Sequence, residues 1–110
     1  MLDVRLYLAQ RISALIMVPL VLGHLAVMIY AIQGGLSAAE ILGRTKGSFF
    51  WFAFYGLFVL AVSVHASIGM RAIVHEWTGI GKRALDIFTL GVGVILSVLG
   101  AWSVMAVTLT

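Results

Sequence analysis

Hydrophobic side chains dominate three long stretches of the chain. Residues 12–39, 47–70 and 87–110 contain no Asp, Glu, Lys or Arg. A helix that crosses the hydrocarbon core of a bilayer, about 30 Å thick, needs about 20 mostly apolar residues at about 1.5 Å each. Each stretch therefore suffices for one crossing and not for two, which predicts an all-α integral membrane domain over residues 1–110. We expect its three transmembrane helices near residues 12–33, 49–74 and 87–109.

Small and polar residues separate these stretches. Gly34 and Gly35 favour a break after the first helix, because paired glycines disrupt helical order at little cost. Ser37 with Glu40 has the spacing of a capping box, which predicts a short surface helix in the first loop. The glycines within residues 78–81 predict a tight turn between the second and third helices.

The composition excludes the soluble classes. Hydrophobic residues make up 63% of the 110 positions and charged residues 10%, whereas an ordinary soluble domain has about 25% charged residues. A soluble enzyme or a nucleic-acid-binding protein is excluded on this ground. The formal net charge of +3 reflects membrane topology and attraction to anionic lipid.

Basic residues predict the orientation in the membrane. Five of the seven lie in the N-terminal arm and the second loop and two in the first loop. Cytoplasmic loops carry the excess of Lys and Arg, so we expect the N-terminus in the cytoplasm and the C-terminus outside. The first apolar stretch is longer than the 7–15 residues of a signal-peptide core. We therefore expect no cleaved leader and a bacterial inner-membrane location.

Two histidines lie within the apolar stretches. An ionisable side chain at membrane depth is a functional candidate by default, and with no cysteine in the chain, haem iron is the expected partner of His65. The alternative is that His24 and His65 form hydrogen bonds between helices. The presence of two such histidines favours a ligand role.

Residues after His65 extend this hypothesis. Gly69 lies one turn later on the same helix face, where a missing side chain would let a flat porphyrin approach. Its alternative role is close packing between helices. Arg71, near the predicted inner interface, would hold a haem propionate or extend to lipid phosphate.

A second group of polar residues is predicted at the inner interface. Glu76 and Trp77 would suit a quinone head group, which accepts hydrogen bonds and takes up protons on reduction. Arg11 and Ser13, at the start of the first predicted helix, are expected at the same depth. These four residues are candidates for one quinone pocket, although Trp77 by itself is typical of an interfacial anchor.

The spacing of these residues resembles a known family. His65, Gly69, Glu76 and Trp77 match the second helix of the succinate dehydrogenase cytochrome b and hydrophobic anchor subunits, in which a haem-ligating His is followed by Gly, an acidic residue and an aromatic residue at these offsets. Residues 11–14 are similar to the family's first-helix Arg-x-Ser element. The chain mixes features of the large and small anchor subunits.

The resemblance implies a non-catalytic subunit of succinate:quinone oxidoreductase. A flavoprotein and an iron–sulfur protein would be its partners, together with a second membrane anchor or a second copy of this chain. Its cofactor would be haem b, with ubiquinone or menaquinone as substrate. Dehydrogenation would take place in the flavoprotein, and the direction, succinate oxidation or fumarate reduction, stays open.

His24 departs from the single-haem pattern. Arg11, Pro19 and His24 resemble the first helix of two-haem anchors, with the His about one turn early. This implies an inner haem at His65 and an outer haem at His24. Two other classes stay open: a haem-free anchor or quinone-binding subunit, and a small transporter, which the lack of an acidic residue in the apolar stretches disfavours.

Overall fold

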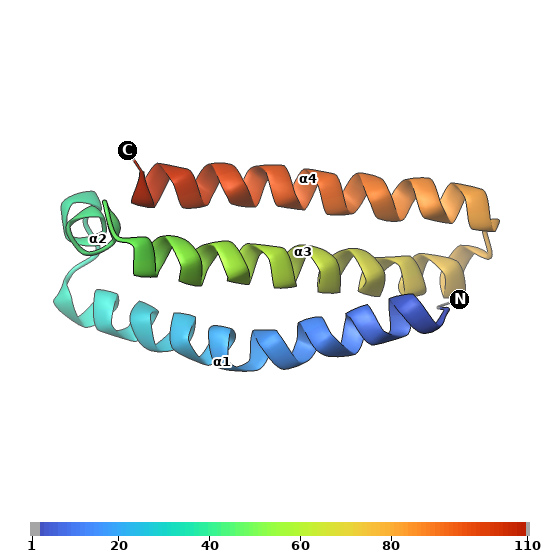
Figure 1. Ribbon diagram of the computed structural model, residues 1–110, viewed down its shortest axis with the longest axis horizontal. Helices are drawn as coiled ribbons and strands as arrows, with labels where there is room; N and C mark the ends of the chain where they lie inside the picture. The colour runs from blue at the N-terminus through green and yellow to red at the C-terminus, as the bar shows by residue number, and fades with distance from the viewer. Residues whose placement is uncertain (1–2, 110) are drawn as a thin grey trace.

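The computed structural model describes residues 3–109 and contains four helices in this range. Figure 1 shows three long helices side by side, with one short helix at the end where the C-terminus lies. Their bounds are α1 Val4–Gly34, α2 Ala38–Thr45, α3 Phe49–Thr78 and α4 Lys82–Thr108. The three long helices are long and apolar enough to span a membrane, which confirms the all-α, three-span prediction.

The breaks between helices follow the sequence closely. The Ser37 hydroxyl accepts a hydrogen bond from the backbone N–H of Glu40 at 3.1 Å, and α2 begins at the next residue after this cap. Gly35 has φ 99° after α1, and Gly79 has φ 66° after α3. Both values lie in the region that favours glycine, so the two predicted breaks and the short surface helix are confirmed.

The helices extend beyond the expected spans. α1 begins at Val4 rather than near residue 12, α3 continues to Thr78 rather than 74, and α4 begins at Lys82 rather than 87. The predicted spans were bounded by charged residues. A charged residue does not end a helix as long as the backbone hydrogen bonds continue through it. The Asp3 carboxylate caps α1 by accepting from the N–H of Leu6 at 2.9 Å.

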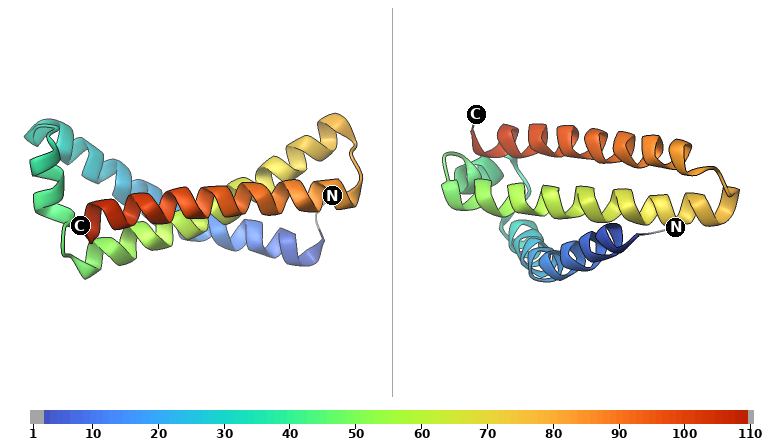
Figure 2. Two further views of the ribbon diagram at one scale, coloured as in Figure 1. Left: turned by 90° about the horizontal axis from the view of Figure 1, so that it is seen from above. Right: turned by 45° about the vertical axis from the view of Figure 1, so that its right-hand side comes forward.

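The long helices form a layer with α3 in the middle. α3 packs against α1 on one side and α4 on the other, whereas α1 and α4 share no extensive packing within residues 3–109. Figure 2 shows from above that α1 and α3 cross each other. The central helix therefore carries the contacts that hold the layer together. Large apolar side chains are exposed on the outer faces of the layer, where they would contact lipid or partner chains.

Small residues allow the helices to approach. The side chain of Val59 on α3 occupies the space where a Cβ at Gly100 on α4 would be placed. A Cβ at Gly23 on α1 would lie 3.2 Å from the Phe54 ring on α3. Such close contacts are the usual way in which membrane helices pack, because lipid gives no hydrophobic drive for helices to associate.

The short helix α2 is fixed to the last turn of α4. The Thr45 hydroxyl donates to the Val107 carbonyl at 2.7 Å, and the backbone N–H of Gly47 donates to the Thr108 carbonyl at 2.7 Å. Both threonines, Thr45 and Thr108, are buried. These bonds satisfy carbonyl groups that a helix C-terminus otherwise leaves without partners.

Candidate functional site

His65 lies near the middle of α3. About 24 Å of helix precede it and about 20 Å follow it, at 1.5 Å per residue. Its side chain is half-buried and faces α1, where the Oγ atom of Ser13 lies 3.4 Å from Nδ1 of His65. Ser13 is itself buried, with 5% of its surface exposed. The contact joins α1 and α3 near the middle of the layer.

Ser13 contacts both a carbonyl of its own helix and the ring of His65. The Ser13 hydroxyl donates its hydrogen to the Gln10 carbonyl, 3.0 Å away, and a carbonyl only accepts. The same Oγ contacts Nδ1 of His65, as an acceptor when Nδ1 carries the proton and as a donor when it does not. No hydrogen bond engages Nε2 within residues 3–109, and in the tautomer with the proton on Nδ1 it has a free lone pair.

His65 borders a pocket of about 360 Å³ between α1 and α3. The other lining side chains are apolar and come from α1: Ala14, Met17, Val18, Val21 and Leu22. No second histidine lines this pocket, and the described chain holds no group of three His, Cys, Asp or Glu side chains suited to a metal ion.

Gly69 shares the face of His65, whereas Arg71 does not. A Cβ at Gly69 would lie 3.6 Å from Nε2 of Gln10 on α1, the helix that His65 also faces. Arg71 faces α4 instead, where its Nη1 donates to the Thr89 hydroxyl at 3.2 Å and lies 2.8 Å from the Asp86 carboxylate. Six residues of helix, at about 100° each, turn Arg71 about 120° away from the face of His65.

The four residues expected in one quinone pocket are dispersed. Ser13 lies beside His65, whereas Trp77 is twelve residues further along α3, about 18 Å away at 1.5 Å per residue. Arg11 is exposed, with its guanidinium 5.6 Å from the centre of the Tyr7 ring. Glu76 is exposed, and Trp77 is 85% exposed. The described structure does not bring these side chains together.

The expectation of a shared depth for these residues is wrong because α1 begins earlier than predicted. With Val4 as its first residue, Arg11 lies two turns inside the helix rather than at its start. The residues that reach the level of Arg71 and His75 are Asp3, Arg5 and Leu6, which line the same pocket as these two. The quinone role of Arg11 and Ser13 is untouched by this correction, but their distance from Trp77 is larger than expected.

His24 lies in a separate region, toward α2. Its ring contacts Phe58 and Tyr55 of α3 edge to face, with ring centres 5.2 and 6.1 Å apart. It borders a pocket of about 270 Å³ that also includes Thr45 of α2 and Ser103 of α4. His24 and His65 therefore line different pockets, so they are not placed to bind one iron atom together.

A cluster of polar residues, of which the sequence pattern indicated only Arg71 as a binding residue, lies at the opposite end of the layer from α2. Arg71 and His75, one turn apart on α3, line a pocket with Lys82 and Asp86 at the start of α4. Their spacing of four residues was a usable signal, because it places two polar side chains on one helix face. The pairing of Arg71 with Asp86 was not predictable, since it depends on the register between two helices.

Comparison with known proteins gives this geometry a context. Residues 1–100 match the family model described as "Succinate dehydrogenase/Fumarate reductase transmembrane subunit". The chain belongs to this family. The match covers the whole of α1, α2 and α3 and most of α4, so the three-span layer is the family domain.

One relative carries a more specific name. The chain is 39% identical over 77 residues to the succinate dehydrogenase hydrophobic membrane anchor subunit of Archaeoglobus fulgidus. The matched part covers 70% of this chain and 64% of the relative, which is slightly less than two thirds of that protein. No solved structure matches the chain. The three long apolar helices and the family match make this chain a multi-pass membrane protein of that family.

Proposed function

We propose that the chain anchors a flavoprotein and an iron–sulfur subunit of succinate dehydrogenase or fumarate reductase to the membrane, holds haem b through Nε2 of His65, and helps form the quinone site. The single observation that carries the haem assignment is the contact between Ser13 and Nδ1 of His65. The contact engages Nδ1, and Nε2 has no hydrogen-bond partner among residues 3–109, so that with the proton on Nδ1 it would offer a lone pair beside an apolar pocket. An orienting hydrogen bond on the other ring nitrogen is the usual arrangement at a histidine metal ligand.

The residues around His65 fit one side of a haem site. The pocket is lined by apolar side chains of α1, and it is open at the surface of the layer. A bound haem b would supply reversible one-electron storage next to the quinone. Since no second histidine lines this pocket, the other axial ligand would come from a companion anchor subunit or from a second copy of the chain.

The quinone site is proposed to be completed by partner chains. Glu76 and Trp77 are exposed at the end of α3, where they are available to a subunit that docks there. Trp77 would donate a hydrogen bond to a quinone carbonyl through its indole N–H but would not supply a proton. Arg11 and Ser13 lie deeper, along α1, and would contact ubiquinone or menaquinone nearer the haem.

The haem assignment is tested by spectroscopy on the assembly extracted from membranes with the chain. His65→Ala is expected to remove the b-type band from the reduced-minus-oxidised spectrum, and added imidazole is expected to restore part of it. Val64→Ala, an exposed neighbour on α3, serves as the packing control and is expected to keep the band. A full haem band in the His65→Ala assembly would overturn the ligand role.

The anchor assignment is tested separately. A flavin-containing subunit is expected to co-purify with the chain from detergent-solubilised membranes, whether or not haem is bound. If flavin is present and the unmodified assembly has no b-type band, the haem-free anchor is the correct alternative. If no flavin-containing or iron–sulfur protein accompanies the chain, the anchor function itself is wrong.

A further inference from the structure

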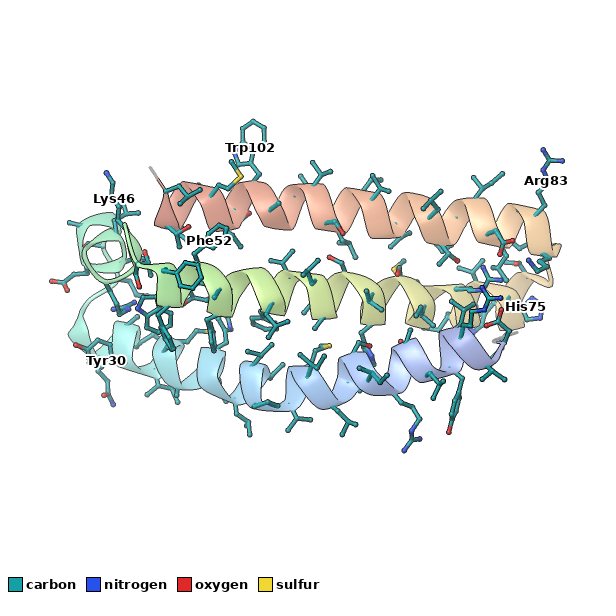
Figure 3. All side chains as sticks on the ribbon, viewed as in Figure 1. Tyr30, Lys46, Phe52, His75, Arg83 and Trp102 are labelled. Carbon is teal, nitrogen blue, oxygen red and sulfur yellow. The ribbon has the colours of Figure 1, made fainter. Side chains whose placement is uncertain are left out.

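The pocket at the end of the layer opposite α2 has the character of a binding site that the proposed function does not use. It has a volume of about 670 Å³ and lies where α1 begins, α3 ends and α4 begins (Figure 1). Its polar lining comes from all three long helices: Asp3, Arg5, Arg71, His75, Lys82 and Asp86. Figure 3 shows His75 where these helix ends meet and Arg83 pointing away from the layer.

Two buried polar atoms in this lining have no hydrogen-bond partner among the described residues. They are Nε of Arg71 and Nδ1 of His75. The Arg71 side chain is only 6% exposed, and its Nη1 atom is already engaged by Thr89 and Asp86. A buried donor without an acceptor is unfavourable in a medium of low dielectric constant, so these atoms favour the entry of a group that carries several acceptor oxygens.

The charges of the lining favour an anion. Three permanent cations, on Arg5, Arg71 and Lys82, line the pocket together with two carboxylates. One of these carboxylates, on Asp86, is already paired at 2.8 Å with both Arg71 and Lys82. One positive charge is therefore in excess before His75 is counted.

Apolar side chains next to the cations indicate what kind of anion it is. Leu90 lines the same pocket and is 69% exposed on α4, and Leu6 of α1 also lines it. Leu90 lies eight residues, about 12 Å, further along α4 than Lys82, whereas Leu6 adjoins Arg5 in the first turn of α1. A phosphate with acyl chains would match both surfaces, because its charge meets the cations and its chains follow the leucines.

We infer that this pocket binds the phosphate group of a membrane phospholipid between the ends of α1, α3 and α4. Arg71 and His75 donate to the phosphate oxygens, and Lys82 and Arg5 neutralise its charge at the pocket mouth. The lipid thereby joins three helix ends, of which α1 and α4 have no extensive packing with each other in residues 3–109.

The test uses the assembly extracted from membranes, stripped of lipid by detergent exchange and titrated with dioleoyl phosphatidylglycerol under native mass spectrometry. One lipid is expected to bind more tightly than the rest. Lys82→Gln and Arg5→Gln are each expected to weaken this binding about fivefold, the order expected for one basic residue beside an anionic lipid. Arg83→Gln removes the same charge from the neighbouring exposed position and is expected to leave the binding unchanged.

Several results would overturn the inference. Equal weakening in Arg83→Gln would show that the lipid responds to overall charge rather than to the pocket. Unchanged binding in Lys82→Gln and Arg5→Gln would exclude the site. Binding of inorganic phosphate without retention of the lipid would assign the pocket to a soluble anion. Loss of the haem band in Arg71→Gln with lipid binding intact would instead assign Arg71 to a haem propionate.

Discussion

Arg71 of α3 and Asp86 of α4 form an ion pair of 2.8 Å in which the arginine side chain is 6% exposed and the aspartate side chain 47%. The pair links the two helices near the turn that connects them. Because Asp86 remains accessible to water while Arg71 does not, the arginine depends on this partner more than the aspartate does. A buried charge that loses its partner is strongly unfavourable.

Asp86→Asn is therefore expected to lower the thermal unfolding midpoint of the purified assembly, because the amide still accepts a hydrogen bond but no longer neutralises the buried Arg71 charge. The midpoint is followed by circular dichroism in detergent. Lys82→Gln removes the exposed ion pair between Lys82 and the same Asp86 carboxylate. It is expected to lower the midpoint less, since exposed ion pairs contribute little to stability. Equal losses in the two variants would contradict a special role for Arg71.

Ser13→Ala is expected to keep haem bound but to hold it more loosely. Loss of an orienting group behind a metal ligand typically reduces affinity by about 10-fold to 100-fold. The rate of haem transfer to apomyoglobin measures this change. The matched control is Ser67→Ala, because Ser67 is also buried and also donates to a carbonyl three residues earlier, but it faces Gly93 on α4. Faster haem loss in both variants would point to general loosening of the helices.

His24→Phe separates packing from coordination. The His24 ring contacts Phe58 and Tyr55 edge to face, and phenylalanine can keep such contacts. If His24 only packs, the variant keeps the haem content per assembly, measured as the pyridine haemochrome, and the thermal midpoint. If His24 binds a second haem, the haem content falls by half while the midpoint is kept. Because of the ring contacts, we expect the first result.

Gly100→Leu is expected to destabilise the assembly by about 1–3 kcal/mol, the usual cost of inserting a larger side chain into a packed contact. The side chain of Val59 occupies the space that the new Cβ would need. Gly91→Leu is the control, because nothing lies within 4 Å of a Cβ at that position. Reversible unfolding in mixed detergent micelles measures both, and equal stability of the two variants would contradict this close approach.

The sequence was sufficient for the number of spans and for the breaks between them. Apolar length depends on the membrane alone, and the capping by Ser37 and the positive φ values of Gly35 and Gly79 are local properties of the chain. The helix ends were not predicted well, because a charge ends an apolar stretch without ending a helix. Asp3, which caps α1, was the available signal for the true start.

The contacts between helices required the structure. Ser13 and His65 are 52 residues apart, and their meeting depends on how α1 crosses α3. The spacing pattern identified both residues as candidates, but it did not indicate that they touch. The pattern also assigned Arg71 to the haem of His65, whereas Arg71 faces α4. The resemblance gives positions along a helix but not which neighbouring helix a side chain faces.

The attachment of Thr45 and Gly47 to the last carbonyls of α4 has a consequence for biosynthesis. The partners of this loop, Val107 and Thr108, are made about sixty residues after it. Until the third span has been inserted, the loop lacks two of its hydrogen bonds. Protease protection of the loop in stalled ribosome complexes would therefore report completion of membrane insertion.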